Sequence, residues 1–531
     1  MKNNINYYYL FFLIFSFIYP SSQAILSYEL KFSEGKGDSR NYFENLLDIN
    51  YFFNSGLYLF AQIEYSSPPL LGSETKALND ITNIFYLQHS SSKYDLTLGN
   101  LYLLYGRGLS LHTYQDQDID YDNSLKGIDF NYHINDNIDL FLSLGTNEVK
   151  SRTNPADIEP SISIDNDIIS IGSTFNYNNI NFHYLSMIYD QSYAYDDINN
   201  LKSLSNILGD YLTTLSGVIS EDNPGYDMTN IEHNLGMEFV LGPIDFYVEK
   251  SLVFYDKLLA ERVDGYKNYF STYMNIFDFN IIYEYKDYST PYLYNIFSTP
   301  PIAFREASSI LSSRNLHTID FSNEYGYHLE INRSFDNSLN FLASYAFALH
   351  HNEDQNDPNV FDFSISLDDF LELSDYFPYK QYYVECSNWN KNGKFYYRIG
   401  YDYFYEITNL KTIKAQTVPM QYVYSFKTGN SLTFYLELQE KIVASTNTEH
   451  KYFYFSPSYN HFGSWLLTFF ADIEQESDKW YALDVTKNFK NSSQISLFYG
   501  SQKGGLVCAN GSCVMQPDFE DGFKVTYRTN F

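Results

Sequence analysis

Hydrophobic and polar positions alternate along most of this chain with the period of two that is typical of β-strands with two different faces. In residues 138–145, every second position from Ile138 to Leu144 is aliphatic, and the positions between begin with Asp139. Residues 395–406 and 432–439 alternate in the same way. Similar runs lie near residues 56–65, 93–104, 167–177, 179–189, 237–254, 276–287, 338–349 and 463–474. Each is about as long as the 9–11 residues of a tilted transmembrane strand. The pattern therefore predicts about two dozen strands.

The last nine residues are the most informative alternating segment. One face carries Phe523, Val525, Tyr527, Thr529 and Phe531, and the other carries Lys524, Thr526, Arg528 and Asn530. A terminal Phe that closes such an alternation is typical of the sorting signal of bacterial outer-membrane β-barrels. The alternative is an amphipathic strand of a soluble sandwich.

The N-terminal residues 1–24 have the layout of a secretory signal peptide. An apolar run at residues 7–18 follows Lys2, and small residues at 22–24 offer a cleavage site. The run is shorter than the about 20 residues that a membrane helix needs. We expect the mature chain to begin near Ile25.

No later stretch is apolar for long enough to span a membrane as a helix, because polar residues interrupt each run. A spanning chain of this kind must form a closed barrel, since only helices and closed barrels satisfy the backbone in lipid. The prediction is an all-β protein: residues 25–531 form one large antiparallel transmembrane β-barrel. Polar stretches near 146–166, 190–230 and 350–378 are expected to be extracellular loops. Residues 197–219 are the best helix candidate and are expected to lie in a loop insertion.

Composition agrees with a barrel and limits the partners. The 531 residues include 54 Tyr, 44 Phe and 3 Trp, and aromatic girdles mark both interfaces of membrane barrels. The formal charge of −31 disfavours nucleic acid, which binds to basic surfaces. It suits divalent cations at acidic loops or a lumen that prefers cations, although acidic loops that aid solubility would give the same charge.

The three cysteines divide into a pair and a single residue. Asn510-Gly511 is a strong hairpin signal, and a two-residue turn there places Cys508 opposite Cys513. Export to an oxidising compartment favours a disulfide between them. A metal pair is the alternative. Cys386 is left over as a buried or lipid-facing residue.

We find no catalytic motif and predict no enzyme activity, cofactor or metal site. Gly106-Arg107-Gly108 lacks the spacings of nucleotide-binding loops, and no nucleophile elbow occurs. The adjacent His350 and His351 lie in a polar stretch, where such residues usually bind nothing. Four aspartates alternate at positions 116, 118, 120 and 122, and would share one face if this segment were a strand. A solvated loop is the favoured interpretation of that segment.

Three blocks of residues resemble an uncharacterised family of Gram-negative outer-membrane β-barrel proteins, catalogued only as a domain of unknown function. The first block is Leu98–Tyr102 with Tyr105–Leu109, Tyr114–Asp116 and Asp122–Gly127. The second is Pro300-Pro301 with Arg305-Glu306, Arg314, His317 and Glu324–Tyr327. The third is Phe498–Gly500 with Lys503–Gly505, Cys508, Cys513 and Asp518–Glu520. The chain departs from the pattern at Arg107, where a small residue is expected, and at His112, where a base such as Arg is expected.

The resemblance implies fold and location but no activity. It implies an outer membrane with lipopolysaccharide around the barrel, and assembly by periplasmic chaperones and the barrel-assembly machinery. The blocks also contain charged residues that suggest a constriction: Arg107, Lys126, Arg305 and Arg314 opposite Asp116, Asp122 and Glu306. Such groups would set a field across the lumen, as charged rings do in pores. The alternative is that they fix a folded-in loop to the barrel wall.

The sequence therefore favours porin-like passage of small polar solutes, with a preference for cations. A sealed scaffold barrel that docks partners or supports surface-protein export is the second hypothesis. An open lumen would favour the first, and a lumen filled by side chains and loops the second.

Overall fold

The structure is a computed structural model. It describes residues 23–36, 41–67, 82–117, 121–151, 162–194, 225–256, 263–290, 299–306, 309–315, 317, 319, 323–336, 338–351, 379–390, 392–407, 412–444, 446, 448–475, 479–490, 492–509, 512–516 and 518–531.

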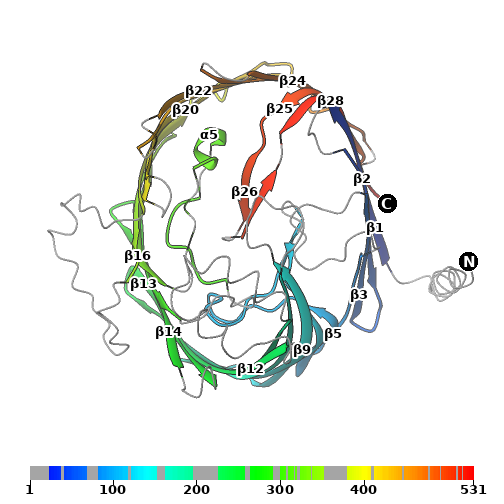
Figure 1. Ribbon diagram of the computed structural model, residues 1–531, viewed down its shortest axis with the longest axis vertical. Coiled ribbons are helices and arrows are strands. Elements are labelled where there is room, and N and C mark those ends of the chain that lie inside the picture. The colour runs from blue at the N-terminus through cyan, green and yellow to red at the C-terminus, as the bar shows by residue number, and fades with distance from the viewer. Residues whose placement is uncertain are drawn as a thin grey trace, which may run out of the picture.

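Twenty-four antiparallel strands form one closed barrel (Figure 1). They are β1 (Gln23–Lys36), β2 (Tyr42–Phe52), β3 (Leu57–Ser67), β4 (Thr82–Ser90), β5 (Tyr94–Leu101), β8 (Leu125–Asn135), β9 (Ile138–Ser151), β10 (Ile162–Tyr177), β11 (Ile180–Ala194), β12 (Gly225–Leu241), β13 (Ile244–Asp256), β14 (Val263–Ile276), β15 (Phe279–Ser289), β16 (Asn323–Ser334), β17 (Leu339–Leu349), β18 (Tyr379–Trp389), β19 (Phe395–Ile407), β20 (Thr412–Ser425), β21 (Ser431–Val443), β22 (Thr448–His461), β23 (Trp465–Glu474), β24 (Lys479–Asn488), β25 (Gln494–Gln502) and β28 (Phe519–Asn530). The predictions of an all-β fold and of about two dozen strands are confirmed.

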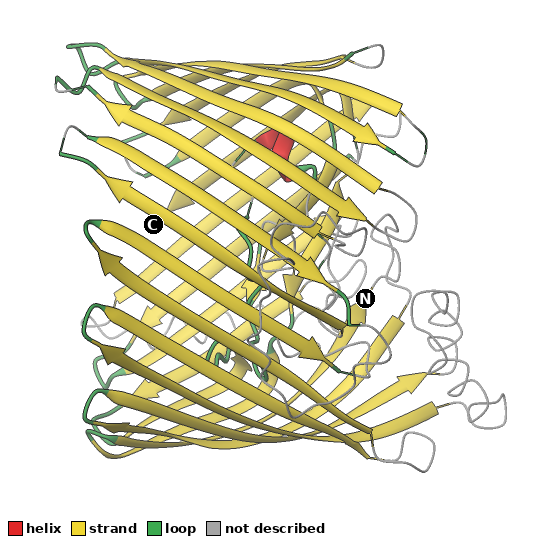
Figure 2. Ribbon diagram, turned by 90° about the vertical axis from the view of Figure 1, so that its left-hand side faces the viewer, coloured by secondary structure: helices red, strands yellow, loops and turns green. Residues whose placement is uncertain are grey.

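The first and last strands close the barrel. β1 pairs with β28 along most of its length, and the terminal Phe531 exchanges backbone hydrogen bonds with Leu26. Strand connections at the end of the barrel where the C-terminus lies are short turns (Figure 2). One of them is the turn at Asn178 and Asn179, both with positive φ, which joins β10 directly to β11. The strand ends that the longer connections join lie at the opposite end of the barrel.

The two faces of the wall differ as the alternation predicts. On β19, Tyr397, Ile399 and Tyr401 are exposed on the outside, whereas Asp402 and Phe404 are buried inside. The faces of 138–145 and 432–439 are confirmed in the same way, with Leu140, Leu142, Phe434 and Leu438 exposed and Phe141, Ser143 and Glu437 buried. The outer surface is therefore a broad apolar and aromatic belt.

Several predicted boundaries are wrong. The run at 237–254 contains two strands, because the chain turns at Gly242-Pro243 between β12 and β13. The polar stretches 146–166 and 190–230 are partly strand, since β9, β10, β11 and β12 extend into them. These strands continue through polar residues, because the wall of a barrel can extend beyond the apolar belt that faces lipid. The helix candidate at 197–219 lies outside the described residues. So do residues 1–22 of the signal peptide predicted at 1–24, which stays a prediction; β1 begins at Gln23, two residues before the expected mature start.

Three connections fold back into the barrel (Figure 1). The Arg107 loop joins β5 to β8 and includes the short strands β6 (Gln115–Asp116) and β7 (Tyr121–Asp122). The α5 segment, described at 299–306, 309–315 and 317, contains the four-residue helix α5 (Ile310–Ser313). The cysteine hairpin consists of β26 (Gly505–Ala509) and β27 (Ser512–Gln516). Within the described ranges, no helix is both long enough and apolar enough to cross a membrane.

Candidate functional site in the barrel interior

The Arg107 loop is an ordered hairpin that points into the barrel. Its two sides are joined by backbone hydrogen bonds from Tyr105 to Leu111 and from Thr113 to Leu103. A tight turn forms the tip, where Gly108 N–H donates to the carbonyl of Tyr105. Gly106 and Gly108 both have positive φ, which favours glycine, and a Cβ at Gly106 would also collide with the Glu249 carboxylate. The glycines therefore allow the turn that presents Arg107.

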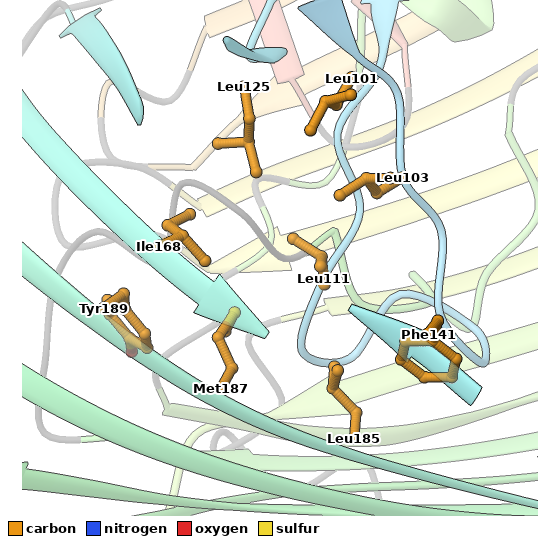
Figure 3. Packing of buried hydrophobic residues seen from close by; sticks show 9 residues of the cluster. All are labelled: Leu101, Leu103, Leu111, Leu125, Phe141, Ile168, Leu185, Met187 and Tyr189. Carbon is orange, nitrogen blue, oxygen red and sulfur yellow. The ribbon is translucent and has the colours of Figure 1, made fainter. Parts of the chain in front are cut away.

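An apolar patch on the inner wall receives this loop (Figure 3). Leu103 and Leu111 pack against Leu185 and Met187 of β11 and against neighbouring side chains. The full cluster is Leu101, Leu103, Leu111, Leu125, Phe141, Ile168, Leu185, Met187 and Tyr189. Burial of this apolar surface stabilises the loop inside the lumen.

Buried polar contacts fix the tip of the loop. The Glu249 carboxylate accepts the N–H of Arg107 at 2.8 Å and the side-chain amide of Asn234 at 2.7 Å. Lys267 donates to the carbonyl of Leu109 and forms a salt bridge with Glu232 at 3.0 Å. Both charged partners are almost completely buried, so loss of either one would leave an uncompensated charge.

The α5 segment is fixed to the opposite wall. Glu437 of β21 is fully buried and accepts the backbone N–H groups of Ile310 and Leu311, both at 2.7 Å. The guanidinium of Arg314 forms a two-pronged ion pair with Asp472 of β23. The two bonds to Glu437 satisfy N–H groups in the first turn of α5, which have no partner within the helix.

His317 continues this segment as part of a buried charge network. Its ring nitrogens lie 2.8 Å from Glu406 and 3.1 Å from Glu324, and Glu324 also pairs with Lys286. The ring stacks on Tyr379 with centroids 4.1 Å apart. Burial alone disfavours the imidazolium, but the charge of Glu324 and the two hydrogen bonds outweigh it. The pKa of His317 is therefore raised above its usual value.

Charged residues also hold the base of the cysteine hairpin. Lys503 pairs with Glu474 at 2.8 Å and lies over the ring of Trp480, and the N–H of Gly504 donates to Asp518.

The register of the hairpin places Cys508 opposite Cys513, as the Asn-Gly turn predicts. Nothing is described of either side chain, so the disulfide stays a prediction. Cys386 has a free thiol and, by the alternation of β18, shares the outer face with Val384.

The predicted constriction residues do not form one ring. Arg305 pairs with Glu330 at 3.3 Å and lies over the ring of Tyr383. The Arg305 and Arg314 pairs join the α5 segment to the wall. The Glu249 contact joins the Arg107 loop to the wall. The alternative interpretation, loops fixed to the wall, describes these contacts.

Lys126 lies outside the lumen. It is exposed on β8 and alternates with Asp129, which faces inward and bonds to Tyr105, so it shares the outer face with Ile128. The prediction failed because successive residues of a strand point to opposite faces, so a difference of one position decides between lumen and outside. Resemblance to the family shows that the residue is present but not which face it occupies.

The aspartates at 116–122 do not share one strand face. β6 and β7 form a small hairpin in which Gln115 pairs with Asp122 and Asp116 pairs with Tyr121. Asp122 is buried and accepts the N–H of Ser124, so the expectation of a solvated loop is wrong there. The chain doubles back on itself within the alternating segment, and Asp118 and Asp120 lie outside the described residues.

A pocket with both charged and apolar side chains in its lining remains between the Arg107 loop, the α5 segment and the wall. Its volume is about 660 Å³. Its lining includes the charged residues Arg107, Glu238, Glu284 and Glu306, the histidines His112 and His183, and the apolar residues Pro300, Pro301, Ile302 and Phe304. Burial lowers the pKa of His112 despite a hydrogen bond with the backbone of Thr299, which favours the neutral ring. Of the predicted constriction residues, the pocket brings together Arg107 and Glu306.

The described side chains include no group of three or more His, Cys, Asp or Glu that could hold a metal ion. His351 instead pairs with Asp287 at 2.9 Å. Divalent cations at acidic loops stay a prediction.

The sequence matches the family of unknown function DUF6029 over residues 18–531. The chain belongs to this family. The match confirms the resemblance, and the description of DUF6029 assigns no activity. A comparison with curated proteins gives no significant match.

Several solved structures are similar in fold to this DUF6029 chain. The P pilus usher PapC translocation pore is 9% identical with a TM-score of 0.43, and 95% of this chain and 99% of that chain are covered. OccK11 of Pseudomonas aeruginosa is 8% identical with a TM-score of 0.38, and 96% of each chain is covered. The siderophore receptor PirA of Pseudomonas aeruginosa is 7% identical with a TM-score of 0.46, with 97% of this chain and 81% of that chain covered. Identities this low indicate a shared type of fold only.

Sequence reasoning missed most of the residues that organise the interior of this DUF6029 barrel. Glu249, Glu437 and Asp472 each appear as one more polar position on an alternating strand. One signal was available at residues 180–189, where apolar residues occupy both faces. Leu185 and Met187 on the inner face needed a cover other than lipid, and the Arg107 loop provides it.

Proposed function

We propose that this protein is an outer-membrane barrel that admits small polar solutes, with a preference for cations, through a lumen narrowed by its own loops. The proposal assigns no catalysis to the chain. The observation that carries it is the acidic inner wall.

Carboxylates face inward on strands around the whole barrel: Glu29, Glu44, Asp48, Asp129, Glu284, Glu330, Glu385 and Asp402. Arg, Lys or His contacts some of them, and the formal charge of the chain is −31. A charged wall of this kind supports passage of ions and polar solutes, because such side chains suit a water-filled lumen and would attract cations into it.

The three inner segments support a restricted pore over a wide general one. Each is fixed to the wall by charged contacts, at Glu249 for the Arg107 loop, at Glu437 for the α5 segment and at Glu474 for the base of the cysteine hairpin. These fixed segments narrow the space that a solute can use.

The same contacts favour the second hypothesis, a scaffold barrel. If the segments never move and seal the lumen, the barrel would present its loops to partners and conduct nothing.

The deciding experiment is conductance of the purified mature chain in planar bilayers, recorded in two salts with unlike ions. Cation-preferring steps support passage. The double variant Arg305→Ala/Arg314→Ala removes two contacts between the α5 segment and the wall and should raise single-channel conductance. Lys126→Ala removes an outward-facing base and serves as the matched control. A folded, heat-modifiable barrel that stays silent in every variant would support the scaffold.

A further inference from the structure

The pocket beside Arg107 contains charged groups of both signs that form no ion pair within the described residues. The guanidinium of Arg107 lies over the ring of Tyr247, with 4.8 Å from its central carbon to the ring centroid. Within the part of the chain that the structure describes, no carboxylate lies within salt-bridge distance of this guanidinium. The contact with Glu249 uses the backbone N–H of Arg107 and leaves the side chain available.

The carboxylates of the pocket are not equivalent. Glu284 is occupied, because it accepts from Tyr269 at 2.6 Å and contacts His328 at 2.8 Å. Glu238 and Glu306 are exposed to the pocket, and neither has an ion-pair or hydrogen-bond partner among the described side chains.

The register brings the opposite charges close together. Glu238 on β12 is the direct cross-strand partner of Tyr247 on β13, the residue that supports the guanidinium. Directly opposed residues have Cβ atoms about 5 Å apart. A positive and a negative group therefore occupy adjacent positions on one wall of the pocket.

We infer that this pocket binds a small zwitterionic solute, an α-amino acid or a short peptide. Arg107 takes the ligand carboxylate, Glu238 and Glu306 take its ammonium group, and the apolar residues of 300–304 contact its side chain. A carboxylate and a planar guanidinium can form two parallel hydrogen bonds. The volume of about 660 Å³ suits a ligand of this size.

The charge pattern argues against simpler ligands. A purely cationic solute would meet the unpaired guanidinium, and a purely anionic one would meet two unpaired carboxylates. Only a solute with both charges satisfies all three groups. The inference names a class of solute for the proposed passage. Binding in the pocket does not depend on the proposed function, but transfer of the bound solute across the membrane does.

The test is calorimetric binding to the detergent-solubilised full-length mature chain. Three probes share one side chain: L-leucyl-glycine carries both charges, L-leucinamide only the ammonium group, and 4-methylpentanoate only the carboxylate. We expect the dipeptide to bind at least about tenfold more tightly than either of the other probes, the effect of one charge-assisted hydrogen bond.

Variants assign the groups. Arg107→Gln should weaken dipeptide binding about tenfold and leave L-leucinamide unchanged, whereas Glu238→Gln should weaken both. Arg398→Gln alters another inward-facing arginine, which contacts Glu385 on β18, and should change neither.

Equal binding of the three probes, absence of dipeptide binding, or an unaffected Arg107→Gln variant would overturn the inference. Dipeptide binding without conductance would overturn the proposed passage and leave the pocket standing. Conductance without dipeptide binding would overturn the inference about the pocket and leave the proposed passage standing.

Discussion

At the residue scale, single buried carboxylates decide where the loops dock. Glu437 accepts two N–H groups of α5, and Glu249 accepts the backbone of Arg107 and the side chain of Asn234. Bonds to a charged acceptor contribute about 1.5–3 kcal/mol each, more than neutral ones. A carboxylate at an inward-facing position of a strand therefore fixes the position of a loop when it accepts the loop's N–H groups.

His317 makes the docking of the α5 segment depend on pH. Its pKa is raised above the ordinary value, so the stability that it contributes is fully present below about pH 6.5 and is lost as pH rises through the raised value. Only the imidazolium can donate to both Glu324 and Glu406. We expect hydrogen exchange in residues 309–315, corrected for its intrinsic pH dependence, to accelerate at alkaline pH.

The variant His317→Gln provides the control for this effect. It keeps a hydrogen-bonding side chain but does not titrate, so protection of residues 309–315 should lose its dependence on pH. The same pH profile in this variant would show that another group is responsible.

At the element scale, the Arg107 loop and the α5 segment each combine an apolar contact with a charged one. Leu109 packs against Tyr247 and Tyr269, and Phe304 packs against the cluster that contains Tyr379 and Phe404. The apolar contact supplies most of the favourable energy, and the charged contact fixes position. These segments thus behave as small parts of a core that the barrel encloses.

Replacing Leu111 with Asp should release the Arg107 loop. Leu111 is fully buried, and even truncation of such a residue to Ala costs about 2–5 kcal/mol. Hydrogen exchange in residues 103–113 should accelerate while the barrel strands stay protected. Leu104→Asp in the same loop is the matched control, because Leu104 is 58% exposed and tolerates a charge. Equal rates of hydrogen exchange in the two variants would contradict the conclusion that buried apolar contacts hold the loop against the wall.

The cysteine hairpin should contain a disulfide between Cys508 and Cys513. Thiol titration of the denatured, unreduced protein should detect one reactive cysteine out of three, and peptide mapping should identify it as Cys386. Closing so small a loop stabilises the hairpin by only about 2 kcal/mol on the chain-entropy model, so reduction should leave the barrel folded. Three reactive thiols would contradict the pairing.

At the scale of the whole molecule, a closed wall separates an apolar outside from an acidic inside. β1 and β28 join the ends of the chain, and Arg528 of β28 forms a two-pronged contact with Glu29 of β1 across this seam. Closure removes the free strand edges that would otherwise promote aggregation.

The acidic interior predicts cation preference that depends on salt. In a potassium chloride gradient, the reversal potential should indicate cations at about 0.1 M and move toward zero at about 1 M, because the screening length falls from about 10 Å to about 3 Å. The double variant Glu44→Gln/Asp48→Gln should reduce the preference at low salt. Anion preference at low salt would contradict the acidic pore.

The sequence by itself determined the barrel. Alternation on β19 and on β28, the turn at Asn178-Asn179 and the hairpin signal in the sequence Asn510-Gly511 are local features, because strand faces repeat every two residues and turn chemistry acts within a few residues. The strand number and the two faces follow from such features. The turn at Gly242-Pro243 was missed, and the ends of the longer strands were misplaced where polar residues continue the wall beyond the apolar belt.

Only the tertiary structure decided what fills the lumen. Arg314 contacts Asp472 across 158 positions of sequence, and Arg107 contacts Glu249 across 142. No local pattern encodes such pairs, because alternation gives the face of a residue but not the segment that covers it. The outward position of Lys126 and the hairpin that separates Asp116 from Asp122 show the same limit: placement depends on register and on where the chain turns back.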